Sequence, residues 1–250
     1  MPSFRATVAL MLLLSVLPVA AQDLASTCHA TSSYDVTINT DSVIFDRPSP
    51  APARVELQHG SLRADGASVK LSAENQDRMT LFERDLRLLA PRVKTVAQNG
   101  VDMAVRAVQA EAGGLGLSAE TRAELDQRLQ AHASEMKTRI AASRGTHDWD
   151  GDASGEYANQ LGADLLPLIA GDLGQQAIDA ALGGDLQAAA TLRDRAASLT
   201  TEMQPRLLSR MQALRPQIQA LCPAIQRLAE LQQDVRGGNG LPLDLIQTGG

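Results

Sequence analysis

The sequence predicts an α+β protein in which a small N-terminal antiparallel β-meander packs on a larger bundle of kinked helices. Short apolar segments separated by turn residues fill residues 33–71, a pattern typical of antiparallel strands. Beyond residue 72, apolar residues recur mainly at spacings of three and four, as they do on one face of a helix. Prolines within these stretches predict that the helices bend.

Residues 1–21 are predicted to be a signal peptide. Arg5 supplies a positive start, residues 6–17 are apolar, and small residues precede the expected cleavage after Ala21. Twelve apolar residues are too few to span a bilayer, which needs about 20. No later segment is apolar enough to do so. We therefore expect an exported chain in the periplasm of a Gram-negative bacterium, with no transmembrane segment after cleavage.

Residues 22–72 form the predicted β-meander subregion. Asp65-Gly66 is a favourable hairpin turn, and the prolines at 48, 50 and 52 cannot donate backbone hydrogen bonds, so they predict a loop. So few strands need a partner for their apolar face. The expected strands are Tyr34–Ile38, Val43–Phe45, Val55–Leu57, Leu62–Ala64 and Val69–Leu71.

Residues 73–250 form the predicted helical subregion, which we expect to share one domain with the meander. Ser72 is a suitable N-cap for the first helix, which should kink or split near Leu89 because of Pro91 and end at Gly113-Gly114. Its predicted apolar seam consists of Met79, Phe82, Leu86, Leu89, Val93 and Val96.

The rest of the chain predicts several further helices. Ser118 should cap one that ends near Gly145, residues 146–156 look irregular, and residues 157–169 are helical up to Pro167. Glycines then delimit a short helix at residues 177–182. The run 187–235 keeps its apolar spacing across Pro205, Pro216 and Pro223, which predicts bent or closely abutting helices. Residues 241–246 are a short strand or a docked extended segment.

The two cysteines, Cys28 and Cys222, most simply form a disulfide in an exported chain. The alternatives are two free thiols or a metal pair. A metal pair needs further ligands nearby, and the sequence shows none. A catalytic thiol is disfavoured because there is no C-x-x-C motif.

Composition disfavours two classes of ligand. Without residues 1–21 the chain has 22 basic and 29 acidic side chains, and Lys and Arg do not cluster, so we expect no nucleic-acid binding. Aromatic residues are scarce, whereas carbohydrate and base-stacking surfaces need aromatic faces.

The strongest candidate for chemistry is the acidic stretch from Asp148 to Ser154. Its oxygen-bearing side chains at alternate positions resemble the start of a calcium loop. However, Ala153 replaces the expected glycine and Asn159 the expected bidentate glutamate, which favours a solvated linker. His147 beside it is a single imidazole, which is too little for a transition-metal site.

No catalytic, cofactor-binding or metal-binding residue is predicted, because the sequence has no nucleophile elbow, zinc-protease, P-loop or dinucleotide motif. His29, His59 and His132 are isolated, and pairing on a solvated helix face explains Glu120 and Glu124. The polar side of the 187–235 run, also interpreted as a wet face, carries Gln204, Arg210, Gln217 and Arg227.

Several positions within residues 28–110 resemble the YggN-like family of exported proteobacterial proteins. They are Gly60, Leu62, Gly66, Val69, Leu71, Gln76, Phe82, Pro91, Val93, Gly100 and Val101. The signal peptide and the early cysteine before a strand fit this resemblance as well. The family is a domain of unknown function, so it implies a periplasmic α+β protein and no catalytic residues.

These observations favour a non-enzymatic periplasmic protein that binds a protein partner or self-associates, for example in envelope maintenance. This hypothesis rests on the expected export, on the absence of catalytic motifs and on long apolar helical faces that exceed what one core can absorb. The first alternative is a carrier or sensor of a small apolar ligand held between meander and helices. The second is a hydrolase whose site is assembled without a local motif.

Overall fold

The computed structural model describes residues 26–149, 151–238 and 240–249, without the side chains of residues 151–159 and 199–204. The signal peptide predicted for residues 1–21 lies outside this part of the chain. The fold is α+β, as predicted. Two compact units emerge: the described parts of 20–97, 141–150 and 215–250 form a sheet unit, and 98–140 with 151–214 form a helical unit. That the 22–72 and 73–250 subregions share one domain stays a prediction.

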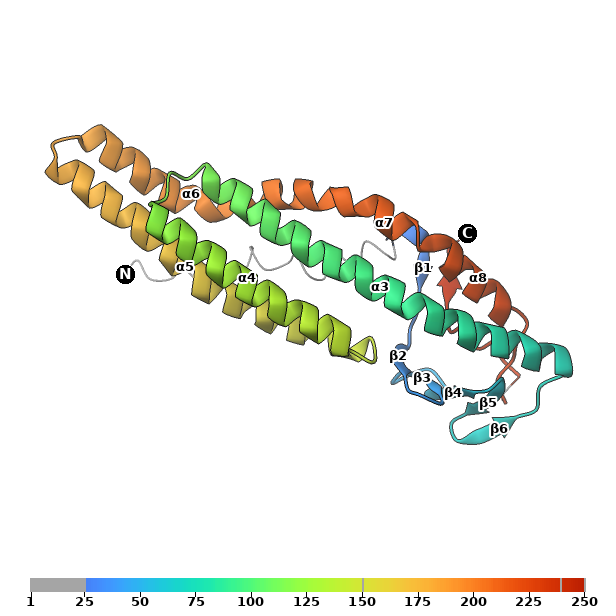
Figure 1. The fold of residues 1–250 in the computed structure, drawn as a ribbon. Coiled ribbons are helices and arrows are strands. Elements are labelled where there is room, and N and C mark those ends of the chain that lie inside the picture. The colour runs from blue at the N-terminus through green and yellow to red at the C-terminus, as the bar shows by residue number, and fades with distance from the viewer. Residues whose placement is uncertain (1–25, 150, 239, 250) are drawn as a thin grey trace. The chain divides into compact units, whose positions relative to one another are not determined.

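The sheet is an antiparallel meander in the order β2-β3-β4-β5-β6 (Figure 1). Two of its hairpins close through two-residue turns, His59-Gly60 and Asp65-Gly66, with all four residues at positive φ. Such turns match the twist of the strands they join. The strands are β2 (Asp35–Ile38), β3 (Val43–Asp46), β4 (Arg54–Gln58), β5 (Ser61–Ala64) and β6 (Ala67–Val69).

The chain's two ends meet in a second, two-stranded sheet. β1 (Ala30–Thr31) pairs antiparallel with β7 (Gln247–Thr248). Just before β7, the side chains of Leu243 and Leu245 are buried in the core of the sheet unit. The tail is therefore docked on this core, as in one of the two predicted alternatives, but it is not extended throughout, since Asp244 has φ +49°.

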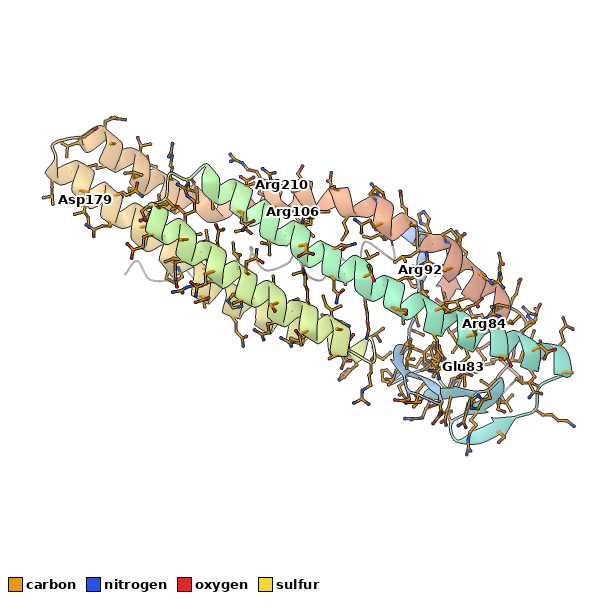
Figure 2. All side chains as sticks on the ribbon, viewed as in Figure 1. Glu83, Arg84, Arg92, Arg106, Asp179 and Arg210 are labelled. Atoms are coloured by element: carbon orange, nitrogen blue, oxygen red, sulfur yellow. A yellow bond between two sulfur atoms is a disulfide. The ribbon has the colours of Figure 1, made fainter. Side chains whose placement is uncertain are left out.

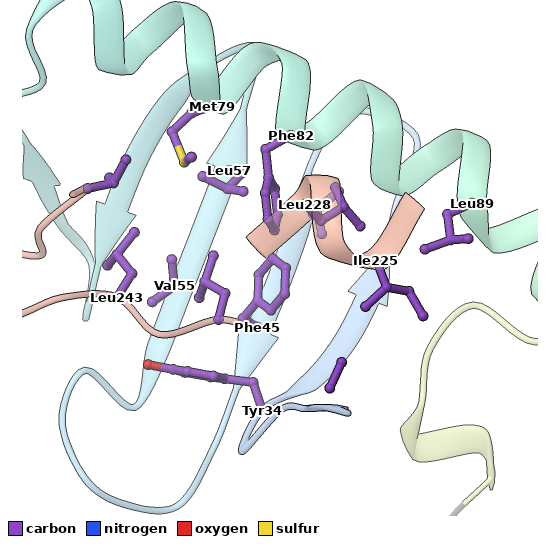
Figure 3. Close-up of a cluster of buried hydrophobic side chains, with 14 of the residues drawn as sticks. Tyr34, Phe45, Val55, Leu57, Met79, Phe82, Leu89, Ile225, Leu228 and Leu243 are labelled. Atoms are coloured by element: carbon purple, nitrogen blue, oxygen red, sulfur yellow. The ribbon is translucent and has the colours of Figure 1, made fainter. Parts of the chain in front are cut away.

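Two helices cover the apolar face of the meander, α3 (Ala73–Gly113) with its N-terminal half and α8 (Cys222–Gln232) (Figure 3). Ser72 caps α3 as predicted, since its Oγ accepts a hydrogen bond from the Asn75 N–H at 3.2 Å. Phe45 lies between Tyr34 and Phe82, with ring centroids 6.2 and 6.1 Å away. The core between sheet and helices includes Val43, Phe45, Val55, Leu57, Met79, Phe82, Leu89, Ile225 and Leu228.

Helix α3 continues without a break through Pro91, so the split considered near Leu89 does not occur. A proline in a helix loses one backbone hydrogen bond, a penalty of about 3 kcal/mol that tertiary packing can offset. Buried side chains on both sides of Pro91, such as Leu89 and Val105, supply that packing.

The helical unit consists of the end of α3, α4 (Ala119–Ala142), α5 (Gly151–Leu182) and α6 (Leu186–Met211). Ser118 caps α4 as predicted, accepting from the Thr121 N–H at 3.1 Å. Within this unit α5 and α6 run antiparallel (Figure 1). Its buried core is Val105, Ala112, Leu117, Leu125, Leu129, Ala133, Leu165, Ile169 and Leu173.

The prediction of a separate short helix at residues 177–182 is wrong. α5 is one helix that passes through Pro167, Gly171 and Gly174. Leu165, Ile169 and Leu173 follow each other at spacings of four and are all buried, so their packing overrides the local helix-breaking preference of the glycines. Residues 146–156 are also more regular than predicted, with a 3₁₀ turn η1 (His147–Trp149) before α5.

The run 187–235 forms abutting helices, as predicted. After α6 come a 3₁₀ turn η2 (Gln212–Leu214), α7 (Arg215–Gln219) and α8. Pro205 lies inside α6, whereas Pro223 occupies the first turn of α8, where its missing N–H is tolerated. Among the helices that the structure describes, none combines the length and apolar character that crossing a membrane requires.

Candidate functional site

The turn between α5 and α6 is a closely hydrogen-bonded helix-to-helix connection. The backbone N–H groups of Gly183, Gly184 and Asp185 all donate to carbonyl groups of the last turn of α5. Gly184 has φ +86°, a conformation that glycine adopts without strain. The Asp185 carboxylate then accepts from the Ala188 N–H at 2.9 Å, which caps α6. The connection between α5 and α6 is thus held by hydrogen bonds at both helix ends.

Large apolar side chains are exposed around this turn. Ile178, Leu182 and Leu186 are 55, 83 and 71% exposed, and together they form what we call the hairpin tip. Ile178 and Leu182 are four residues apart on one face of α5, and Leu186 opens α6. Full burial of one such side chain is worth roughly 2 kcal/mol. Clustered exposed apolar side chains of this kind mark interaction surfaces.

The hairpin tip is acidic as well as apolar. Residues 173–192 contain Asp179 and Asp185 and no lysine or arginine. Asp179, labelled in Figure 2, lies between Ile178 and Leu182 in the last turns of α5. An anionic bilayer attracts basic segments, so this charge favours a basic partner over a membrane surface.

A groove of about 860 Å³ lies between the end of α3 and α6, within the helical unit. Its walls carry three arginines, two serines and one carboxylate, with Ala110, Leu115 and Pro205 as apolar contacts. The polar side chains are Glu111, Arg195, Ser198, Arg206, Ser209 and Arg210. We call it the arginine groove.

Glu111 fixes two of these arginines. Arg210 donates from Nε and Nη2 to Oε1 of Glu111 at 3.0 and 2.8 Å, and Arg206 donates from Nη1 to Oε2 at 3.4 Å. The glutamate side chain is only 9% exposed, whereas the two arginines are 49 and 62% exposed. The hydrogen bonds from Arg210, and then those from Arg206, lower the pKa of Glu111, which therefore stays ionised at neutral pH.

A second charged cluster joins α4 to α5. Asp164 accepts from Arg128 at 2.7 Å and lies 2.9 Å from Nε2 of His132, and Arg128 also binds Glu124 at 2.7 Å. The hydrogen bond with His132 and the charge of Arg128 lower the pKa of Asp164. These side chains are partly exposed and paired with one another, so they are explained as a cross-link between two helices. Glu124 is therefore part of an ion pair, as its sequence context suggested.

The acidic stretch is only partly described, because Asp150 and the side chains of residues 151–154 fall outside the described part. Asp148 accepts backbone hydrogen bonds from Arg144 at 2.7 Å and Gly145 at 3.1 Å. These two bonds lower the pKa of Asp148, in that order of importance. Its carboxylate is thus engaged in a turn beside β2. Among the residues that the structure describes, no group of three or more His, Cys, Asp or Glu is placed to hold a metal ion.

The predicted disulfide between Cys28 and Cys222 is confirmed, with the two Cα atoms 5.0 Å apart. It joins the N-terminal segment to the first turn of α8, inside the core of the sheet unit. The bond is structural, since its surroundings are apolar side chains.

The other candidate residues do not converge on one site. His29 and His59 lie in turns at positive φ, and His132 belongs to the α4–α5 cluster. Of the predicted wet face, Arg227 binds Asp85 at 2.8 Å, Arg210 lies in the arginine groove, and the side chain of Gln204 is not described. Sequence reasoning missed the groove and the hairpin tip. The only available signals were the shared helical face of Arg195, Arg206 and Arg210 and the leucines that flank Gly183-Gly184.

A family model described as "Protein of unknown function (DUF2884)" matches residues 28–238. The chain belongs to this family. The match covers both units and agrees with the resemblance to YggN-like proteins. No curated protein and no solved structure matches the chain significantly. The description of the family assigns no activity.

Proposed function

We propose that the protein is an exported, non-enzymatic binding protein of the periplasm that docks to a protein partner through its hairpin tip. One observation carries this proposal: Ile178, Leu182 and Leu186 are exposed at a helix turn that is closed by backbone hydrogen bonds and capped by Asp185. Export is supported by the disulfide, because disulfides persist in oxidising compartments, and by the apolar segment before Gln22. A role in envelope maintenance is consistent with this location.

The composition of the hairpin tip defines the kind of surface that the partner must offer. Its docking site is an apolar groove bordered by Lys and Arg, because Asp179 and Asp185 flank the apolar side chains and residues 173–192 lack basic groups. Amphipathic helices that insert apolar residues into such grooves are a common mode of recognition. The capped turn favours this mode, since a preordered tip loses little conformational freedom on binding.

The interface between meander and helices gives no support to the alternative of an apolar ligand carrier. Phe45, Leu57 and Phe82 occupy that space and are at most 1% exposed, so a ligand there would have to displace core side chains (Figure 3). Nor do the candidate polar side chains that the structure describes converge as a hydrolase requires.

Site-specific cross-linking in cells tests the proposal. We expect Leu182→benzoylphenylalanine to give a discrete adduct with another protein, and Glu135→benzoylphenylalanine, an exposed site on α4, to give none. Leu186→Ser combined with Asp179→Lys should reduce the Leu182 adduct roughly tenfold, equivalent to the loss of one good contact. An adduct between two copies of this chain, or equal adducts at both positions, would overturn the proposed partner.

Determination of the N-terminus tests the export step separately. The protein recovered from a periplasmic fraction should begin at Gln22. A chain that keeps residues 1–21 or is found only in the cytoplasm would contradict export without bearing on the hairpin tip.

A further inference from the structure

We propose that the arginine groove is a binding site for a small amphipathic oxyanion, that is, a phosphate or carboxylate group attached to an apolar body. The site lies on α3 and α6 within the helical unit and is separate from the hairpin tip. It therefore goes beyond the proposed docking function and does not depend on it.

The arginine groove carries an excess of positive charge. Among the described lining residues there are three guanidinium groups and one carboxylate. Arg195 is exposed and forms no ion pair within the described part of the chain. An excess of positive charge along a groove attracts anions.

The hydrogen-bond donors of the groove are preorganised. The nearly buried Glu111 holds Arg210 by two hydrogen bonds and Arg206 by one. A guanidinium group has five N–H donors, so Arg210 keeps three for other acceptors. Ser198 and Ser209 line the same groove, and the Ser198 hydroxyl donates to the Arg195 carbonyl oxygen at 3.4 Å. Fixed guanidinium groups beside hydroxyls suit phosphate and carboxylate oxygens.

The groove also offers space and apolar contacts to the rest of the ligand. Ala110, Leu115 and Pro205 give the groove apolar contacts beside its arginines. Its volume of about 860 Å³ is within the range of small-molecule sites, which is roughly 300–1,000 Å³, and well above the needs of a bare phosphate. A short acyl or alkyl chain would cover these apolar side chains.

Calorimetric titration of the purified chain, residues 22–250, tests this site with four probes: octyl phosphate, octanoate, inorganic phosphate and octanol. We expect saturable one-to-one binding of octyl phosphate or octanoate, weaker binding of inorganic phosphate, and no binding of octanol. The preferred head group identifies phosphate or carboxylate as the recognised oxyanion. Equal binding of octanol would overturn recognition of the anion, and equal binding of inorganic phosphate would overturn the apolar component. No binding of any probe at millimolar concentration would overturn the site.

Two variants link binding to the groove. Arg195→Ala should weaken binding roughly tenfold, as loss of a charge-assisted contact does, without changing the melting temperature. Arg193→Ala is the matched control, because Arg193 is exposed on α6 and does not line the groove. At Gly114, which lines the groove, an added Cβ would meet only the Glu111 carbonyl oxygen, at 3.4 Å. Gly114→Phe should therefore fold and block binding. Unchanged binding in both groove variants would contradict the assignment.

A final comparison separates the two sources of such a ligand. Sedimentation with phosphatidylglycerol vesicles that depends on Arg195 would identify a lipid headgroup within a bilayer. Binding of octyl phosphate without vesicle sedimentation would identify a free amphiphile. Vesicle binding that Arg195→Ala and Gly114→Phe leave unchanged would contradict the groove as its site.

Discussion

Glu111 on α3 and Arg210 on α6 are joined by two hydrogen bonds of 3.0 and 2.8 Å to one carboxylate oxygen, across 99 residues of sequence. The glutamate is largely covered by its surroundings and the arginine is half exposed. This arrangement ties the end of α3 to α6 and at the same time presents guanidinium N–H groups in a groove. The pair thus has one structural role and one proposed binding role, which different measurements separate.

The structural role of Glu111 predicts a pH-dependent contribution to stability. Its pKa is lower in the folded chain than its ordinary value near 4.5, chiefly because of Arg210. The stabilisation is therefore complete above that ordinary value and is lost as the pH falls through the lower, folded pKa. Glu111→Gln should reduce the free energy of unfolding by about 1 kcal/mol at pH 7 and by less at pH 3, measured by urea denaturation. An equal difference at both pH values would contradict the ion pair.

The second prediction concerns Gly60, whose turn lies against α3, so that a larger residue there should destabilise the packing of α3 on the sheet. Gly60 has φ +78°, and an added Cβ would lie 2.2 Å from Oγ1 of Thr80 and 2.8 Å from the Gln76 carbonyl oxygen. Gly60→Ala should therefore destabilise the fold by about 3 kcal/mol, combining strain and overpacking.

Gly66 is the matched control for that change. It has a similar φ of +80°, but nothing lies within 4 Å of an added Cβ. Gly66→Ala should cost only the conformational strain, about 1 kcal/mol. Equal losses of stability in the two variants, measured by thermal denaturation, would show that the contact with α3 is unimportant.

The disulfide leads to a third prediction. Cys28 and Cys222 are 194 residues apart, and a crosslink over such a loop stabilises by about 5 kcal/mol at most in the chain-entropy account. The double variant Cys28→Ser/Cys222→Ser should lower the melting temperature, and a reducing agent should lower that of the natural chain to a similar value. If the reductant lowers the melting temperature of the double variant as much as that of the natural chain, the effect of the reductant does not come from breaking this bond.

The meander was predictable from sequence, whereas the groove was not. Alternating apolar residues and Asp65-Gly66 are local signals, and the structure places β2 to β6 close to the expected segments. The prediction that α5 is interrupted was wrong. It rested on the local helix-breaking preference of Gly171 and Gly174, which the tertiary packing of Leu165, Ile169 and Leu173 outweighs.

The features that could not be predicted from the sequence depend on pairs of residues that are far apart in the chain. Glu111 and Arg210 carry no motif in sequence, and their meeting depends on how α6 returns along α3. The disulfide was predictable only because the chain has two cysteines, which leaves one intramolecular pairing. The exposure of Leu182 was missed for the opposite reason, because an apolar residue at helical spacing usually faces a core.

The fourth prediction distinguishes the hairpin tip from the core of its own unit. Leu182 is 83% exposed and Leu173, nine residues earlier on the same helix, is fully buried. Leu182→Ser should change the free energy of unfolding by at most about 0.5 kcal/mol, since it removes almost no packing. Leu173→Ala should lower it by roughly 2–5 kcal/mol, because it leaves a cavity in the core. A large loss on changing Leu182 would mean that the side chain stabilises the fold, and the tip would no longer be a free docking surface.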